Sequence, residues 1–517
     1  LCRRSARPTA LRAGASVLPV HRGASSGRPE TELAYRAGRG PRRRAHADVG
    51  VRVVSDVRHP RMRAMSETSL NQHDGARSGT EASNGLSPSM VRRAIFASIL
   101  GNGLEWFDFL IYGYFAKIIA QVFFPGGSGF VSIMLTLATF AVGFIVRPIG
   151  GILLGIYADR AGRRKALSLL IISMAASTLL MGLTPGYASI GIAAPLLVVF
   201  ARLLQGLSVG GQFATASAML VEYAPPHKKM FYGSFNMSAQ AFALLLSSGV
   251  GYLLTTQLTH EQLVAWGWRL PFLFGALAGP FGFYIRHRVA ESPEFERLLD
   301  QRDKPPRVTV RQFFRDNGDA AICAMGVIII GAATNYVWHS YLSVYVERQL
   351  HLPLSTALLG AFVSGVLNLF LFPLSGKLAD RYGAYRLFYP IVIAWMLCVY
   401  PLYHFVVTNP TPGHLFIAQM VATVFLAAMS GSHPGMLATL FPVRSRSAGV
   451  ALSYNIAVTL FGGMAPLTIT GLTHLTGSSL TPAFYLIFAG FVSLAMVYFT
   501  RSGREPGGAS AKFAAPR

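Results

Sequence analysis

The stretch Gly155–Lys165 (GIYADRAGRRK) is a short charged hairpin between two long apolar runs. Residues 130–154 contain one charged side chain, Arg147, and residues 166–201 contain none. A second copy, Gly376–Arg386 (GKLADRYGAYR), begins 221 residues later. Both copies read G-x-x-x-D-R-x-G followed by basic side chains. The same loop at the same place in two apolar halves indicates an internally duplicated membrane protein.

The chemistry of this hairpin suits a movable contact at a membrane edge. An aspartate can accept hydrogen bonds at a helix N-terminus, glycine permits a tight turn, and basic side chains face anionic lipid head groups. An ordinary basic loop is the alternative, but the repetition of Asp and Gly argues against it. We therefore predict a gating loop formed by Gly155, Asp159, Arg160, Gly162 and Arg163, with Asp380, Arg381 and Gly383 in the second copy.

The composition is typical of a polytopic membrane protein. Of 517 residues, 52% are hydrophobic and 13% are charged, whereas soluble domains contain about 25% charged residues. The net charge of +24 lies partly in residues 1–64, which hold 15 Arg and 4 acids, and otherwise mostly in short loops. This distribution reports membrane topology and does not indicate a nucleic-acid partner. The three cysteines imply neither a disulfide framework nor a metal cluster.

Residues 1–90 are expected to lie outside the folded domain. The first 64 are rich in Arg, Ala, Gly and Pro, and residues 66–90 are polar. An organelle transit peptide and a disordered basic tail are two interpretations. We favour a third, translated upstream sequence with initiation near Met62, Met65 or Met90.

Twelve apolar segments are long enough to span a bilayer, at roughly 20 residues each. They lie near 94–121, 129–156, 166–184, 190–221, 230–256, 267–287, 319–346, 354–378, 387–407, 413–440, 447–472 and 481–500. The sequence thus predicts an all-α membrane protein with twelve transmembrane helices.

The loops that follow the even-numbered segments carry most of the basic side chains, so both termini are predicted to be cytoplasmic. The longest loop divides the segments six and six. We expect a first half at 91–287, a cytoplasmic linker at 288–318, a second half at 319–501 and a short tail at 502–517. Two such halves with a site between them is one of the designs of transporters built from repeats.

Several motifs resemble those of the major facilitator superfamily. The two charged loops resemble its signature loops, and Arg202–Gly206 (RLLQG) resembles its fourth-helix arginine motif. Four stretches resemble a narrower group within it, the metabolite–proton symporters. They are Gly101–Phe109 (GNGLEWFDF), Gly143–Gly151 (GFIVRPIGG), Leu207–Gly211 (LSVGG) and Glu291–Phe295 (ESPEF). Residues 442–466 are most similar to the citrate and tricarballylate branch. Departures at Gln212, at Phe235-Asn236 and between Tyr341 and Tyr345 leave the substrate open.

Glu105 and Asp108 are spaced i, i+3 and therefore share one face of the first segment. Two carboxylates this close in a medium of low dielectric constant disfavour joint ionisation, so one is expected to hold the coupling proton. Arg202 lies at a similar depth and is the expected counter-ion. A static structural ion network is the alternative. We predict that Glu105, Asp108 and Arg202 carry proton coupling.

Other polar side chains inside the apolar segments are candidates for substrate contact. Arg147 is a cation that suits a carboxylate, although structural pairing is the competing interpretation. The remaining candidates are Asn102, Gln240, Tyr336, His339 and His433, for each of which helix packing is the alternative. His433-Pro434-Gly435 also predicts a break in the tenth helix.

Together these features predict a secondary active transporter of the bacterial inner membrane, and our hypothesis is proton-coupled symport of a di- or tricarboxylate such as citrate by alternating access. We expect a monomer in a lipid bilayer with an anionic small-molecule substrate, no nucleic acid, no metal and no cofactor other than the proton. Symport of a betaine- or proline-like osmolyte, a shikimate-like acid or a sugar is the alternative, and a transporter-like receptor is a further one. No nucleophile–base set or phosphate-binding loop is evident, so we do not expect an enzyme.

Overall fold

The computed structural model describes residue 103, residues 106–126, 128–151, 153, 163–222, 224–276, 279, 310–442 and 445–500. All of them belong to one of the chain's two compact units, Thr80–Arg517. Within these residues the secondary structure is helical, without strands. In this described part of the chain, nine helices are long and apolar enough to cross a membrane, and three further helical stretches (106–123, 163–183 and 263–276) overlap the remaining expected segments.

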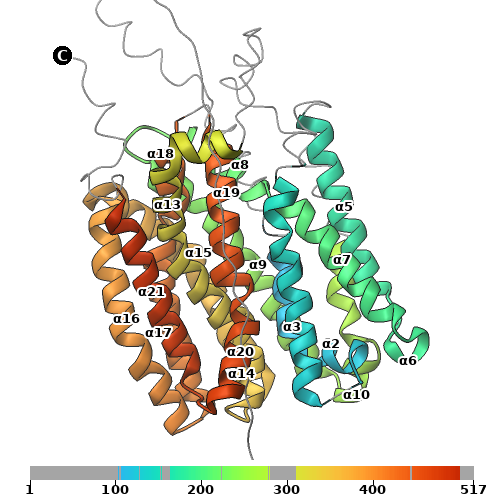
Figure 1. Ribbon diagram of the computed structural model, residues 1–517. Helices are drawn as coiled ribbons and strands as arrows, with labels where there is room; N and C mark the ends of the chain where they lie inside the picture. The colour runs from blue at the N-terminus through green and yellow to red at the C-terminus, as the bar shows by residue number, and fades with distance from the viewer. Residues whose placement is uncertain are drawn as a thin grey trace, which may run out of the picture. The chain divides into compact units, whose positions relative to one another are not determined.

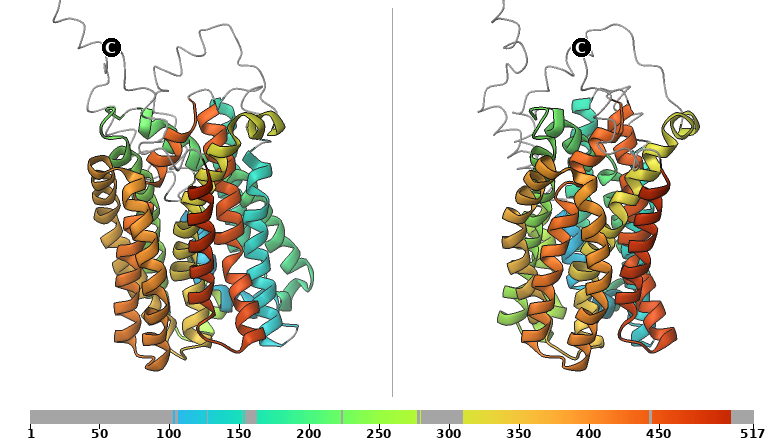
Figure 2. Two further views of the ribbon diagram at one scale, coloured as in Figure 1. Left: turned by 60° about the vertical axis from the view of Figure 1, so that its left-hand side comes forward. Right: turned by 90° about the vertical axis from the view of Figure 1, so that its left-hand side faces the viewer.

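The helices follow the predicted order closely. In the first half they are α2 (Ala116–Phe123), α3 (Gly129–Ile145), α5 (Arg163–Leu183), α6 (Tyr187–Ile190), α7 (Ala193–Val209), α8 (Gln212–Glu222), α9 (Lys229–Gln257), α10 (His260–Gln262) and the π-helical turn η1 (Leu263–Gly267). In the second half they are α13 (Val310–Asn335), η2 (Tyr336–Tyr341), α14 (Leu342–Arg348), α15 (Leu354–Tyr382), α16 (Ala384–Thr408), α17 (Pro412–Ser430), α18 (His433–Leu440), α19 (Arg446–Val458), η4 (Thr459–Gly463), α20 (Ala465–Thr476) and α21 (Thr481–Phe499). Figures 1 and 2 show these helices running roughly alongside one another.

Two proline-containing stretches interrupt their helices. Helix α3 ends at Ile145 and helical structure resumes at residues 147–151, next to Pro148. Helix α17 ends at Ser430 and α18 begins at His433, next to Pro434. Proline cannot donate a backbone hydrogen bond and its ring crowds the preceding turn, which explains both interruptions. The predicted break in the tenth helix is confirmed.

Helical structure also enters the stretch that was expected to be linker. Helix α13 begins at Val310, and Asn317 within it has non-helical backbone angles of φ −129° and ψ 21°. The apolar span itself is assigned to Arg315–Arg348. The polar, charged residues before the kink explain why hydropathy alone places the start of this helix later.

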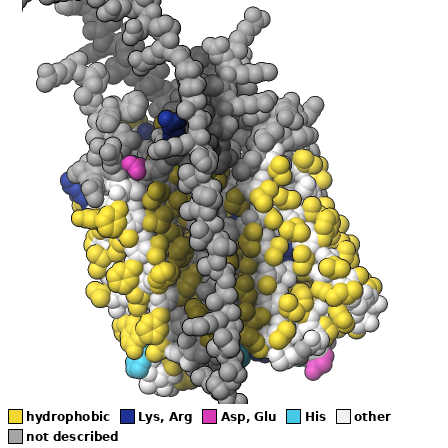
Figure 3. Space-filling view, in the orientation of Figure 1, with side chains coloured by type: hydrophobic (Ala, Val, Ile, Leu, Met, Phe, Trp, Pro, Cys, Tyr) yellow, Lys and Arg dark blue, Asp and Glu magenta, His cyan; other side chains and the backbone are white. Residues whose placement is uncertain are grey.

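The outer surface of the helices is apolar. Large hydrophobic side chains such as Phe370, Leu397 and Phe499 are more than 70% exposed. In Figure 3, hydrophobic side chains cover most of the part of the face that grey atoms leave visible, and its charged groups lie mainly toward the two ends. Such a surface fits the hydrocarbon core of a membrane, where no water competes for apolar contact.

Helix α9 packs antiparallel along α15. Gly251 lies against Leu358 near one end, Gly365 against the Leu245 backbone in the middle, and Gly376 against the Met230 backbone near the other end. Glycine at these points removes the side chain that would hold the backbones apart. The two halves therefore meet along the full length of this pair of helices.

A second antiparallel contact joins the helix of α3 to that of α19, η4 and α20. The Thr459 hydroxyl donates a hydrogen bond of 2.9 Å to the Phe144 carbonyl, and the Phe130 ring stacks on His474 at 3.8 Å between centroids. The Asn455 amide adds a bond of 2.6 Å to the carbonyl of Gly210, at the α7–α8 junction.

Close approach of α3 and α7 depends on glycine. A Cβ on Gly206 would overlap the Gly143 carbonyl oxygen, and one on Gly210 would overlap the Arg147 carbonyl oxygen. We predict that Gly206→Ala destabilises the protein by about 1–3 kcal/mol, because the two backbones must separate. Thermal unfolding in detergent measures this change.

Gly211→Ala is the matched control, because no heavy atom lies within 4 Å of the added Cβ. Equal unfolding temperatures for the two variants would contradict the predicted close contact.

Candidate functional site

A buried ion pair connects the first helix to α7. The Arg202 Nη1 atom lies 3.4 Å from Asp108 Oδ2, and the two side chains are 0% and 2% exposed. Ionised groups are costly in an apolar interior, so each requires a partner. The structure therefore brings together two of the three residues predicted to carry proton coupling. The third, Glu105, lies outside the described residues.

Aromatic rings surround the two buried arginines. The guanidinium carbon of Arg202 lies 3.8 Å from the centre of the Tyr112 ring and 5.6 Å from that of Phe109. The guanidinium carbon of Arg147 lies 4.3 Å from the centre of Phe109 and 3.9 Å from that of Phe144. Phe109 thus contacts both cations, and the faces of these rings stabilise positive charge in the absence of water.

The charged cluster retains unused hydrogen-bonding capacity. Asp108 Oδ1, the Nε and Nη2 atoms of Arg202 and the Nε atom of Arg147 have no partner among the described residues. Buried polar atoms are normally paired, and those that are not call for an explanation. A site that exchanges protons and binds an anion intermittently would account for them.

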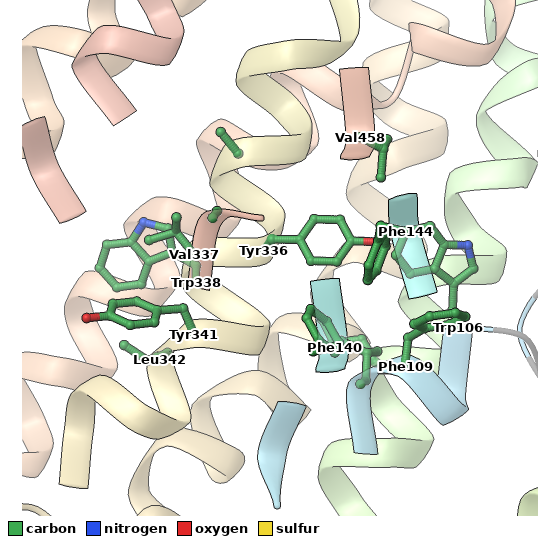
Figure 4. Close-up of a cluster of buried hydrophobic side chains, with 14 of the residues drawn as sticks. Trp106, Phe109, Phe140, Phe144, Tyr336, Val337, Trp338, Tyr341, Leu342 and Val458 are labelled. Carbon is green, nitrogen blue, oxygen red and sulfur yellow. The ribbon is translucent and has the colours of Figure 1, made fainter. Parts of the chain in front are cut away.

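Tyr336 belongs to an aromatic cluster between the two halves. Its ring centre lies 5.8 Å from that of Trp106 and 5.3 Å from that of Phe144, and Figure 4 shows it pointing toward Phe144. Trp338 and Tyr341 point to the other side of the same segment. Phe144 contacts both Tyr336 and Arg147, so the cluster links the predicted substrate residue Tyr336 to the cation.

Gln240 lies at a second contact between the halves. Its Nε2 atom donates a hydrogen bond of 3.5 Å to the Tyr454 hydroxyl. The Tyr454 ring stacks on Phe213 with 3.7 Å between centroids and an angle of 9°. Gln240 also lines a narrow cavity together with Trp106, Leu110, Ala241, Leu244, Asn335, Asn368 and Phe372.

The two predicted histidines are buried but separate from the ion pair. His339 lies in η2 with neither ring nitrogen paired among the described residues. His433 begins α18, and its ring lies against Gly331 of α13. Within the described residues, no hydrogen bond or ion pair joins either histidine to Asp108 or Arg147. The remaining substrate candidate, Asn102, lies outside the described residues.

The second charged loop contacts the N-terminus of α9. The carboxylate of Asp380 accepts hydrogen bonds from the backbone N–H groups of Met230 and Phe231, at 3.0 and 2.9 Å. Gly383 has a φ of +91°, which a side chain would disfavour, and it separates α15 from α16. The Arg381 guanidinium lies 5.2 Å from the centre of the Tyr382 ring.

The described residues contain little of the first charged loop. Arg163 begins α5, whereas Gly155, Asp159, Arg160 and Gly162 lie outside the described residues. The predicted gating role of this copy therefore stays a prediction.

Two further ion pairs join the halves at opposite ends of the helices. Arg446 Nη1 of α19 lies 3.0 Å from Glu222 Oε1 of α8. Lys117 Nζ of α2 lies 3.4 Å from Glu347 Oε1 of α14. Neither pair was predicted from the sequence. The sequence feature that could have indicated these pairs is the presence of opposite charges at corresponding ends of the predicted segments.

Removal of one member of the Asp108–Arg202 pair should leave the other buried and unpaired. We predict that Asp108→Asn and Arg202→Gln each destabilise the protein by about 3–5 kcal/mol. The double variant should lose less than the sum, by about 1 kcal/mol or more. Thermal unfolding of the four proteins measures this coupling.

Lys117→Gln and Glu347→Gln form the control cycle, because Lys117 is 48% exposed and an exposed pair contributes about 1 kcal/mol or less. Additive losses in the Asp108–Arg202 cycle would rule out an energetically coupled pair.

Comparisons with known proteins agree with this fold. The family model described as Major Facilitator Superfamily matches residues 98–411. A citrate-proton symporter of Salmonella typhi is 33% identical over 413 residues, which cover 79% of this chain and 94% of that protein. A glycine betaine/proline/ectoine/pipecolic acid transporter of Dickeya dadantii (strain 3937) is 33% identical over 417 residues, covering 79% and 83%.

Solved structures show the same fold. A proton:xylose symporter bound to 6-bromo-6-deoxy-D-glucose superposes with a TM-score of 0.66 over 82% of this chain and 99% of that chain, at 19% identity. The family match, the relatives and the apolar helices lead to one conclusion. This multi-pass membrane protein belongs to the major facilitator superfamily of transporters.

Proposed function

We propose that the protein is a proton-coupled secondary active transporter that moves a small carboxylate by alternating access. The observation that carries this proposal is the Asp108–Arg202 ion pair, buried beside the second cation Arg147. The named activities of the relatives also support it, since they include proton symport of citrate and transport of proline and betaine.

The ion pair provides a physical route to coupling. Protonation of Asp108 removes its negative charge, and the attraction that holds Arg202 at 3.4 Å then weakens. Because Asp108 and Arg202 lie on different helices, loss of the attraction favours movement of α7 relative to the first helix. Deprotonation restores the pair, so the state of the proton and the arrangement of the helices are linked.

Alternating access also requires contacts that open at one end at a time. At the end that carries Asp380, the contacts are Asp380 with the N-terminus of α9 and Glu222 with Arg446. At the opposite end, Lys117 pairs with Glu347 and the Ser343 hydroxyl donates a 2.8 Å bond to the Gly113 carbonyl. On this proposal, the contacts at one end break while the contacts at the other end stay formed.

The first substrate candidate is a di- or tricarboxylate such as citrate. Arg147 supplies a buried cation with an unpaired Nε atom, which suits a carboxylate. The second candidate is a carboxylated osmolyte such as proline or betaine. The observation that favours it is the aromatic lining of the cavity by Trp106 and Phe372, because aromatic faces also attract alkylammonium groups.

The membrane location, the orientation of the termini and the oligomeric state are part of the same proposal. We infer location in the bacterial inner membrane, with both termini cytoplasmic by the distribution of basic loops. The protein would act as a monomer in the lipid bilayer, with the proton as its coupling ion and without a cofactor.

Uptake into proteoliposomes tests the function. We expect one member of a panel of labelled citrate, succinate, shikimate, proline and betaine to accumulate when a pH gradient is imposed. Accumulation should collapse when an ionophore removes the gradient. Absence of gradient-driven uptake for every compound would reject proton-coupled transport of a carboxylate.

Asp108→Asn should abolish uphill accumulation, because an amide cannot exchange the coupling proton. Exchange of labelled for unlabelled substrate without a gradient should persist if the variant folds. Asp319→Asn is the matched control, since Asp319 is an exposed carboxylate in the N-terminal part of α13, just after the kink at Asn317. Undiminished accumulation by Asp108→Asn would exclude Asp108 as the proton site.

Asp380→Asn should change the initial uptake rate by roughly fivefold. The substitution removes the negative charge at the N-terminus of α9, a contribution of about 1 kcal/mol to the closed arrangement at this end. Initial rates at saturating substrate measure the effect, again with Asp319→Asn as control. A rate equal to that of the unmodified protein would argue against a gate at Asp380.

A further inference from the structure

Tyr112 lies one helical turn after Asp108 and shares its contact with Arg202. Residues four apart lie on the same face of a helix, so the carboxylate and the phenol ring are neighbours along the helical stretch 106–123. Asp108 Oδ2 lies 3.4 Å from Arg202 Nη1, and the centre of the Tyr112 ring lies 3.8 Å from the guanidinium carbon. The guanidinium group therefore has two partners on one helix, and the attraction of only one of them depends on a proton.

Two contacts from α3 fix the Tyr112 ring. Its hydroxyl donates a hydrogen bond of 3.1 Å to the Thr136 carbonyl, and its ring stacks on that of Phe140 with 5.8 Å between centroids and an angle of 16°. Tyr112 is 0% exposed, so no water competes for either contact. A ring held by a neighbouring helix keeps its place when the charge on Asp108 changes.

Arg202 has few other partners that could replace Asp108. Its Nε and Nη2 atoms have no hydrogen-bond partner among the described residues. The charged or titratable side chains that act on it in this part of the chain are Asp108, Tyr112 and Arg147, and Arg147 repels it. The group of α5 that bonds to α7 is the neutral Thr178 hydroxyl. Loss of the negative charge on Asp108 thus leaves aromatic faces as the groups that stabilise Arg202.

We propose that Tyr112 is a positioning residue that holds Arg202 when Asp108 is protonated. The inference rests on the proposed function and extends it, because it gives the arginine a defined partner in the protonated state. The face of an aromatic ring attracts a guanidinium group, and the attraction is stronger where water is excluded. Tyr112 thereby makes proton uptake by Asp108 less costly than it would be with Arg202 left unpaired in an apolar interior.

Removal of the ring should make Asp108 harder to protonate. Without the ring, the ionised pair keeps its mutual attraction, whereas the protonated state loses the partner of Arg202. We expect Tyr112→Leu to move the midpoint of Asp108 protonation to lower pH by roughly one unit, which is about tenfold in proton affinity. Tyr112→Phe keeps the ring face and should return the midpoint toward that of the unmodified protein.

Infrared difference spectroscopy measures this midpoint without transport. The purified full chain in lipid bilayers is titrated with acid, and the carbonyl stretch of protonated carboxyl groups is followed. The part of the band that Asp108→Asn removes belongs to Asp108. Tyr114→Leu is the matched control, because Tyr114 lies on the same helix, is 3% exposed and contacts the Gly251 position of α9. This control should leave the midpoint unchanged.

Fluorinated phenylalanines at position 112 separate the electrostatics of the ring face from the size of the ring. Successive fluorine atoms withdraw electrons from the face and weaken its attraction for a cation, while the shape of the ring is nearly kept. The midpoint should therefore fall stepwise as fluorine atoms are added to Tyr112→Phe. This series tests the inference even if Tyr112→Leu does not fold.

A midpoint that is unchanged in Tyr112→Leu, or that shows no trend in the fluorinated series, would overturn the inference. The same holds if Asp108→Asn removes no part of the band, since Asp108 would then bind no proton. Failure of the proposed function has a different signature. A midpoint that depends on the ring at position 112, combined with no gradient-driven uptake, would reject proton-coupled transport and leave the role of Tyr112 established.

Discussion

The cost of burying charge in an apolar interior governs the centre of this protein. Asp108 and Arg202 are almost fully buried, so each depends on the other and on the groups around it. Phe109 contacts both Arg202 and Arg147, and Tyr112 covers the remaining face of Arg202. The rings exclude water while still stabilising positive charge. On the proposed function, protonation of Asp108 would therefore change the energy of the ion pair without compensation by water, and the surrounding helices would have to respond.

Glycine contacts set the geometry in which that response occurs. Gly143 and Gly206 allow α3 and α7 to approach until backbone touches backbone. This proximity brings the guanidinium carbons of Arg147 and Arg202 to within 4.3 and 5.6 Å of the centre of the Phe109 ring. A larger residue at either glycine would separate the helices and alter every distance in the charged cluster. The electrostatics of the site thus depend on residues that have no side chain.

The sequence predicted most of the fold because hydropathy decides it. Within the described residues, each long apolar run is helical, and the interruptions near Pro148 and Pro434 follow from missing backbone donors. The π-helical turns η2 and η4 were not predicted, because their register depends on packing such as that of Gly462 against Tyr336. Helix α13 begins before the predicted apolar segment, because its first residues are polar and hydropathy does not detect them.

The candidate site was predictable in part for a similar reason. Depth along a helix follows from counting residues, so Asp108 and Arg202 could be matched before the structure was known. The rotation of each helix about its axis could not be obtained in this way. Rotation decides that Asn335 and Asn368 share a cavity with Gln240, whereas His433 lies against α13. The ion pair of Glu222 and Arg446 also depends on how two distant segments meet.

The separation of charged and neutral groups bears on how such a site can be selective. A guanidinium group attracts any carboxylate, so Arg147 by itself cannot distinguish one small acid from another. Distinction requires a group that one candidate satisfies and another leaves unpaired, since an unpaired buried atom costs more than a good contact adds. The side chains Gln240, Asn335 and Asn368 are neutral and polar, and these residues line the cavity between the halves. On the proposed function, Arg147 would supply attraction for the carboxylate, and neutral groups of this kind would have to distinguish one carboxylate from another.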